Sequence, residues 1–213
     1  MPVSQDQLEA IMPDSKTDGR AAAWAAPLNA ALDRFEINTT PRIAMFIGNM
    51  AVESGQLSAR EEDLRYSANR LRAIFPGMFA GAKSVIADQI VAAGHPAIAN
   101  YIYDDANRPP TARLGNTQPG DGFRYRGRGP LQTTGRSNYA AFFASVGMPK
   151  DSDPDFLLTP DGGSTASAFF WKSHGCNPLA DAGDFSGCVS KINPAQVDMA
   201  KRQAFFAKAM AVL

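Results

Sequence analysis

Cysteine, histidine and tryptophan are scarce in this chain of 213 residues, which contains two of each. Two cysteines, Cys176 and Cys188, are too few for the disulfide framework of a small secreted domain. They favour two reduced thiols in a protein made in the cytosol. His174 lies near both cysteines in sequence, but the three lack the paired spacing of a zinc site. We therefore expect neither a bound metal nor a cofactor.

An excess of charge of either sign is also missing, because 21 basic residues balance 21 acidic ones. A neutral chain has no overall field that would attract nucleic acid. One Arg-Gly-Arg-Gly run, at residues 126–129, has the form of an RNA-binding repeat, but it occurs once and outside any low-complexity sequence. Arginines do dominate residues 108–136, which would suit an anionic substrate or simply keep a surface soluble.

Long hydrophobic runs are absent as well. The apolar stretch at residues 21–32 is short and is interrupted by Pro27 and Asn29, so it cannot cross a membrane. The first residues, MPVSQDQLEAIMP, have neither a basic n-region nor an apolar h-region. We therefore expect no signal peptide and no stable membrane insertion.

The sequence does contain the composition of one globular domain over residues 1–213, with 45% hydrophobic and 20% charged residues. Ile43, Phe46, Ile47 and Met50 have the spacing of a buried helical stripe that begins at Thr40-Pro41 and stops at Gly55. Similar patterns predict helices at 20–36, 68–75, 82–93, 96–103, 136–146, 164–174, 184–192 and 195–212. Residues 104–130 have the turn chemistry of a long loop, and the only strand signal is a small hairpin around 57–66.

Four carboxylates, Glu53, Glu61, Glu62 and Asp63, follow the predicted helix that starts at Thr40. Glu53 lies at the edge of the apolar stripe, where lost hydration would raise its pKa and suit a general acid. The others lie in a polar stretch, where a carboxylate stays ionised and can act as a base. Spacing alone nevertheless favours a solvated acidic face, because clustered charges are mostly surface features.

A second stretch, FRYRGRGPLQTTGRSNY at residues 123–139, is suited to binding a sugar. Gly127 and Gly129 let the backbone approach a ligand closely. Polar side chains then follow in a row, and Tyr125 and Tyr139 offer rings on which a sugar could stack. The polar residues are Gln132, Thr133, Thr134 and Asn138.

Together with AFFWKSHGCNPLADAGDFSGCVSKIN, these two stretches closely resemble family 19 glycoside hydrolases, and within them the compact phage-type endolysins and bacterial chitinase-like proteins. The resemblance runs from about residue 20 to the end of the chain. It implies a mainly α, bilobed, lysozyme-like fold with a cleft between the lobes and at most a small β-hairpin. It also implies a single catalytic domain without a separate wall-binding domain.

The resemblance implies roles for particular residues. Glu53 is the general acid, Glu62 is the general base, and Thr134 helps to hold the attacking water. The remaining matched or neighbouring positions, expected to contact substrate, are Gln132, Asn138, Tyr125, Arg128, Asn193 and Arg202. The implied reaction is single-step inversion, which requires carboxyl groups roughly 6.5–9.5 Å apart.

The chain departs from the family pattern at two places. Val52 stands where the family usually has histidine directly before the acid. Pro194 and Ala195 replace the two glycines of the family's Ile-Asn-Gly-Gly motif, which stiffens the backbone beside Asn193. The longer sugar-binding loops of plant chitinases are missing too, which favours a short, open cleft.

These features predict an endolysin, made in the host cytoplasm, that hydrolyses the β-1,4 bonds of peptidoglycan as a muramidase. A holin would give access to the wall without binding the enzyme, which we expect to be a monomer. Three alternatives remain open: a chitinase acting on chitin oligomers, a wall-binding protein that has lost catalysis, and a lytic transglycosylase.

Overall fold

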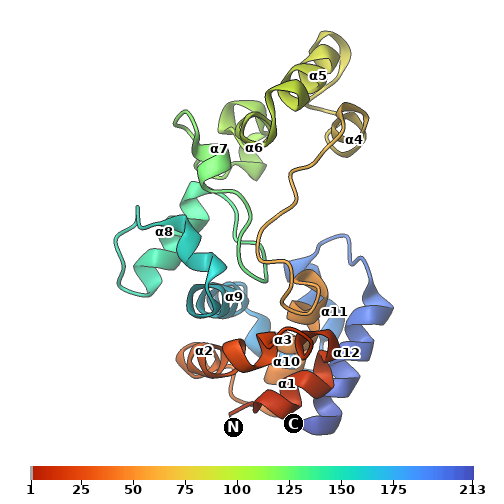
Figure 1. Cartoon of the computed structure of the whole chain (residues 1–213), viewed down its shortest axis with the longest axis vertical. Coiled ribbons are helices and arrows are strands. Elements are labelled where there is room, and N and C mark those ends of the chain that lie inside the picture. Colours follow the sequence, from red (N-terminus) through yellow and green to blue (C-terminus); the bar gives the residue numbers. More distant parts are fainter. Residues whose placement is uncertain (1) are drawn as a thin grey trace. The chain divides into compact units, whose positions relative to one another are not determined.

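The computed structural model describes residues 2–213 as helices joined by turns and loops (Figure 1). The chain divides into two compact units. Unit 1 comprises the residues up to Glu61, Arg128–Gln132 and Asp155–Leu213. Unit 2 comprises Glu62–Gly127 and Thr133–Pro154, so the chain passes between the units four times.

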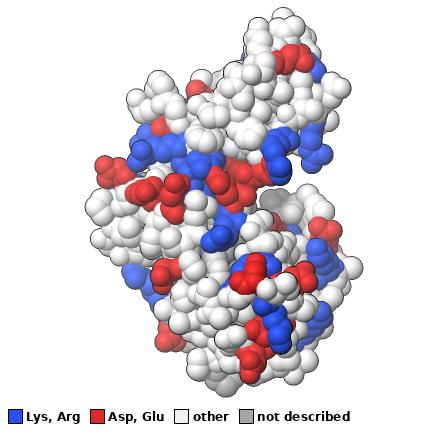
Figure 2. All heavy atoms as spheres, in the orientation of Figure 1, with Lys and Arg blue, Asp and Glu red and all other residues white. Residues whose placement is uncertain are grey.

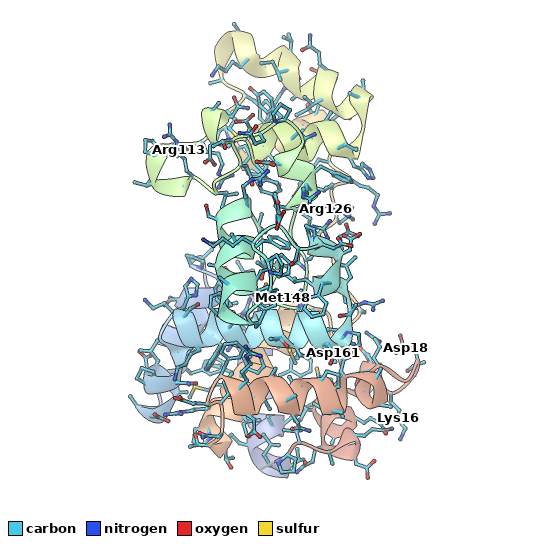
Figure 3. All side chains as sticks on the ribbon, turned by 90° about the vertical axis from the view of Figure 1, so that its left-hand side faces the viewer. Lys16, Asp18, Arg113, Arg126, Met148 and Asp161 are labelled. Atoms are coloured by element: carbon cyan, nitrogen blue, oxygen red, sulfur yellow. The ribbon has the colours of Figure 1, made fainter. Side chains whose placement is uncertain are left out.

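Unit 1 is built around α3 (Thr40–Glu53), in which every residue from Ile43 to Ala51 is buried. The long helices α2 (Arg20–Arg34) and α9 (Pro160–Ser173) lie side by side (Figures 1 and 3), with their N-terminal ends near the labelled Asp18 and Asp161 in Figure 3. Phe46 and Trp171 meet edge to face at 5.5 Å in the core. The other helices of unit 1 are α1 (Gln5–Ile11), α10 (Cys176–Asp181), α11 (Phe185–Ile192) and α12 (Met199–Val212).

The pair α3 and α12 is packed especially closely. Gly48 of α3 faces the backbone of α12, and a Cβ atom there would lie 2.9 Å from the amide nitrogen of Phe206. Because glycine has no side chain, the two helices can approach until their backbones touch. This contact brings the N-terminal half of α12 against the C-terminal end of α3.

Unit 2 has a hydrophobic core of its own. Its first cluster is formed by Leu71, Phe79, Ala87, Ile98 and Ile102. The helices of unit 2 are α4 (Ala68–Ile74), α5 (Ser84–Ala93), α6 (His95–Ile102), α7 (Asp121–Arg124) and α8 (Arg136–Ser145).

The loop between α6 and α8 is held by buried polar side chains. Asp105 accepts hydrogen bonds from the amides of Leu114 and Gly115. Asp121 accepts from the amides of Thr117 and Gln118 and forms an ion pair with Arg136. These partners satisfy carboxylates that would otherwise be costly to bury, so a loop rich in turns becomes a defined part of unit 2.

Most predicted helices are confirmed, with shifted ends. Helix α3 begins at Thr40, as predicted, and its N-cap is Thr39, whose hydroxyl accepts a hydrogen bond from the Arg42 amide. The helix predicted at 164–174 begins earlier, at Pro160, and the one predicted at 195–212 begins later, at Met199. The short helices α1, α7 and α10 were not predicted.

The predicted hairpin at 57–66 is wrong. In the part of the chain that the structure describes, Glu61 instead forms an isolated antiparallel bridge with Arg128. A hairpin is a local structure, whereas this bridge joins residues far apart in sequence, and local patterns do not report such pairs.

Basic and acidic side chains are interspersed over the face shown in Figure 2. Ion pairs join some of the charged side chains of the protein, such as Arg42 and Asp181 at 2.5 Å. Among residues 2–213, the helices are all too short or too polar to cross a bilayer.

Candidate active site

Glu53 is the last residue of α3, in unit 1. Its Oε1 atom accepts a hydrogen bond from the Nη2 group of Arg202 on α12. Arg202 is only 2% exposed. It also donates to Asn49 Oδ1 at 3.0 Å and to the carbonyl oxygen of Val197 at 2.9 Å. The contact of α12 with α3 therefore places a buried cation on the predicted acid.

Asn49 has a fixed orientation in this group. Its Nδ2 donates to the Met45 carbonyl at 2.9 Å, one turn back along α3, which leaves its Oδ1 for Arg202. A buried arginine is tolerated when its donors are paired in this way. Glu53, whose side chain is 21% exposed, is thus the only one of the three polar side chains in this group that reaches solvent.

Glu62 lies in unit 2 and is held at both carboxylate oxygens. Its Oε1 accepts from the amide of Gly127 at 2.6 Å, and its Oε2 accepts from the hydroxyl of Tyr103 at 2.6 Å. The amide of Glu62 in turn donates to the carbonyl of Gly127 at 3.0 Å. Hydrogen bonds of this length to a carboxylate are charge-assisted and strong, so they set the orientation of the predicted base.

Tyr103, at the C-terminal end of α6, was not predicted from the sequence. Burial, together with the neighbouring Glu62 charge, raises the pKa of its phenol well above the usual value. The hydroxyl therefore stays protonated and is the donor in its hydrogen bond to Glu62. No short-range pattern links residues 103 and 62, which meet only through the fold of unit 2.

Backbone hydrogen bonds join the two sequence motifs. Arg60 and Glu61 run antiparallel to Arg128 and Gly129 in unit 1, where the Gly129 amide donates to the Arg60 carbonyl at 2.7 Å. The sequence suggested that the glycines of this motif allow close approach to a ligand. What approaches Gly127 and Gly129 in the structure is the chain around Glu62.

The predicted water-holding and sugar-contacting polar residues lie along the same motif. Thr134 is half-buried, and its carbonyl accepts from Asn138 Nδ2 at 2.7 Å. Gln132 has a left-handed backbone, with φ +53°, and its Nε2 donates to the Gly129 carbonyl at 3.0 Å. Gln132 belongs to unit 1, and the other two belong to unit 2. Their roles toward substrate stay predictions.

Four of the residues that the sequence offered as substrate contacts are buried: Tyr125, Tyr139, Arg128 and, as described above, Arg202. Tyr125 and Tyr139 are 1% and 0% exposed and pack on each other at 5.4 Å, so neither ring offers a face to a sugar. Arg128 is buried too and pairs with Asp155 at 2.8 Å. These buried side chains pack inside the protein and help to hold the backbone of residues 123–139 in place.

The remaining candidates lie in unit 1 or on the acidic stretch. Asn193 is the half-buried C-cap residue of α11, and its amide donates to the Val189 carbonyl at 2.7 Å. Glu61 and Asp63 are exposed, as predicted. Hydrogen bonds from Arg65 lower the pKa of Asp63 to about 2. Over residues 2–213, no group of three or more His, Cys, Asp or Glu side chains is placed to hold a metal ion.

A comparison of sequences shows the family. A protein of Haemophilus influenzae, described as a glycosyl hydrolase family 19 domain-containing protein, is 34% identical over 157 residues, which cover 70% of this chain and 69% of that protein. This chain belongs to glycoside hydrolase family 19. It is therefore a chitinase-like glycoside hydrolase. No family profile matches it.

Solved structures show the same fold. Chitinase C from Streptomyces griseus superimposes with a TM-score of 0.64 at 17% identity, covering 99% of this chain and 93% of that one. A bacterial family 19 chitinase also gives 0.64, at 18% identity and with 100% and 97% coverage. A class IV family 19 chitinase from Zea mays gives 0.62, at 16% identity and with 99% and 94% coverage. The prediction of a mainly α, lysozyme-like fold is confirmed.

Proposed function

We propose that this family 19 hydrolase cuts β-1,4 glycosidic bonds of bacterial peptidoglycan by single-step inversion. Glu53 gives its proton to the glycosidic oxygen as the bond to the anomeric carbon breaks. Glu62 takes a proton from a water molecule held with Thr134, and the water oxygen forms the new bond to that carbon. The configuration at the anomeric carbon is thereby inverted.

The observation that carries this proposal is the pair of held carboxylates. Arg202 donates to Oε1 of Glu53, which orients the carboxyl group and leaves Oε2 to face the glycosidic oxygen. Gly127 and Tyr103 each occupy one lone pair of Glu62, which leaves acceptor positions on both oxygens for water. A solvated acidic patch, the simpler interpretation of this stretch, describes Glu61 and Asp63 but not Glu53 or Glu62.

Peptidoglycan is favoured over chitin by the resemblance to compact endolysins and by the missing plant-type loops. Chitin is the second candidate, because three superimposable structures are described as chitinases. In the first case the enzyme is made in the host cytoplasm, acts as a monomer, and reaches the wall after a holin has opened the membrane. Expression in bacteria with and without a co-expressed holin tests this route, and lysis without permeabilisation would contradict it.

The test of activity is digestion of purified peptidoglycan and of chitin oligomers, followed by mass spectrometry. We expect reducing ends from peptidoglycan, and a new reducing end on N-acetylmuramic acid identifies a muramidase. Glu53→Gln should lower kcat by about 1000-fold, because it removes the general acid. Glu61→Gln, an exposed neighbour, should leave kcat within about twofold and serves as the matched control.

Other outcomes separate the alternatives. Cleavage of chitin alone would identify a chitinase, and tight wall binding without any new ends would indicate lost catalysis. Anhydro ends that survive Glu62→Gln would indicate a transglycosylase, which needs one carboxylate. Full activity of Glu53→Gln would contradict the assignment of the acid.

A further inference from the structure

We infer that Tyr103 is the positioning residue of the catalytic base: its hydroxyl, together with the Gly127 amide, fixes the Glu62 carboxylate in the orientation that activates water. This inference rests on the proposed function, because it takes Glu62 as the base. It adds a residue that none of the sequence motifs contains.

The first argument is the geometry at Glu62. Two donors at 2.6 Å, one on each oxygen, prevent the carboxylate from turning about its terminal bond. The third hydrogen bond, from the Glu62 amide to the Gly127 carbonyl, fixes the backbone from which the side chain extends. A free glutamate has several rotamers, and each would aim its lone pairs differently. Here one rotamer is selected.

The second argument is that the two donors belong to one block of unit 2. Tyr103 is the C-cap residue of α6. Gly127 lies two residues after Tyr125, the C-cap residue of α7. The two helices pack directly, because Gly122 of α7 lies against the backbone of Ala99 and Asn100 in α6. The side chain of Asn100 also accepts from the Phe123 amide at 2.8 Å. The spacing between the two donors is therefore set before any substrate binds.

The backbone of Tyr103 is held as well. Its carbonyl accepts from Asn116 Nδ2 at 3.0 Å, and Asn116 Oδ1 accepts from the Arg136 amide at 2.9 Å. The guanidinium of Arg108 lies 5.9 Å from the centre of the tyrosine ring. Asn116 is 1% exposed. A buried amide with both ends paired is a rigid support, and here it supports the residue that orients the base.

The charges around the phenol decide its role. Burial is the main cause of its raised pKa, Glu62 and Tyr66 add to it, and Arg108 opposes it. The phenol therefore stays protonated at neutral pH. It can orient a carboxylate, but it cannot take a proton from water or carry one away. Tyr103 is a positioning residue and not a second base.

The test is Tyr103→Phe in the full chain, assayed on the glycan that the wild type cleaves. We expect kcat to fall about 10- to 100-fold with KM within twofold, because misplacing a reacting group lowers the rate without weakening substrate binding. The matched control is Tyr101→Phe, a half-buried tyrosine of the same helix whose ring stacks on Phe79. It loses the same hydroxyl and should keep kcat within twofold.

A double-mutant cycle with Glu62→Gln measures the coupling between residues 103 and 62 in kcat. A purely structural role of Tyr103 would give no such coupling. If Tyr103 acts through Glu62, Tyr103→Phe costs less than twofold once residue 62 is glutamine. An equal loss in both backgrounds would overturn the inference, as would unchanged kcat or a rise confined to KM. Thermal unfolding of every variant identifies any loss that comes from misfolding, and in that case the cycle is repeated below the lowest midpoint.

The two proposals fail separately. If Glu62→Gln lowers kcat strongly and Tyr103→Phe leaves it unchanged, only the inference on Tyr103 is overturned. If the wild type cleaves chitin and not peptidoglycan, the proposed substrate is wrong, and the same variants on chitin still test Tyr103. If Glu62→Gln keeps full activity on both glycans, the assignment of the base fails and both proposals fall.

Discussion

Arg202 is a charged side chain almost entirely removed from solvent, and its position carries a cost that its partners must offset. Its guanidinium donates to Glu53, Asn49 and the Val197 carbonyl. Removing one partner of such a group leaves the others buried and unpaired, which costs more than the pair itself contributes. The orientation of Glu53 and the packing of α12 on α3 therefore depend on the same residue.

We expect Arg202→Met to lower the free energy of unfolding by about 3 kcal/mol, because Asn49 and Glu53 lose their donors. Activity should fall as well, since Glu53 is no longer held. Urea unfolding followed by circular dichroism measures the first effect. The control is Lys201→Met, an exposed neighbour on α12, which should stay within about 0.5 kcal/mol of the wild type. Equal stability of Arg202→Met and Lys201→Met would show that the buried pair is not important to the fold.

The packing of α6 on α7 sets the positions of both groups that donate hydrogen bonds to Glu62, the predicted base. Gly122 faces the carbonyl of Ala99, and any side chain there would overlap that oxygen. A larger residue must push the helices apart, and the donors from Tyr103 and Gly127 would move with them. The geometry at Glu62 is thus set by a position that does not touch it.

We expect Gly122→Ala to destabilise the protein by about 2 kcal/mol through overpacking. It should also lower kcat, because the Tyr103 hydroxyl and the Gly127 amide would move away from Glu62. Gly77→Ala is the control in the same unit, since a Cβ there meets no atom within 4 Å. Thermal unfolding and a kinetic assay of both variants test this, and a Gly122→Ala protein with wild-type stability would contradict the packing argument.

Periodicity in the sequence predicted the elements well but not their partners. The stripe of Ile43, Phe46 and Met50 predicts α3 because a buried helical face leaves a local signature. Glu53 and Glu62 were selected by family motifs, since spacing alone favoured a solvated patch. Tyr103 and the ion pair of Arg202 with Glu53 depend on contacts between distant segments, which no local pattern records. Tyr125 was misassigned because an aromatic ring looks the same in sequence whether it faces the core or a ligand.

At the scale of the whole molecule, unit 1 is assembled from three separate segments of the chain. Its two thiols lie deep inside it, on α10 and α11, and both are fully buried. Cys188 donates from Sγ to the Cys176 carbonyl at 3.6 Å. The hydrogen bond with Cys176 and burial both raise the pKa of the Cys188 thiol. The reactivity of the two thiols therefore shows whether unit 1 is folded.

We expect a chromogenic disulfide reagent to label neither cysteine in the native protein over minutes, because both thiols are buried and the reagent cannot reach them. Unfolding in urea without reductant should expose two thiols per chain. Rapid labelling of the native protein would contradict the burial of these residues. Absence of label in urea would show a disulfide and contradict the free thiols of the structure.

The pairing of Glu53 with Arg202 also has a consequence for the order of synthesis. The two residues are separated by 149 positions. A ribosome adding about 5–20 residues per second would need roughly 7–30 s to travel from one to the other. Throughout that interval the nascent chain contains Glu53, the predicted acid, but not yet the arginine that orients it. Until Arg202 has been made, Glu53 therefore cannot take the orientation that it has in the structure.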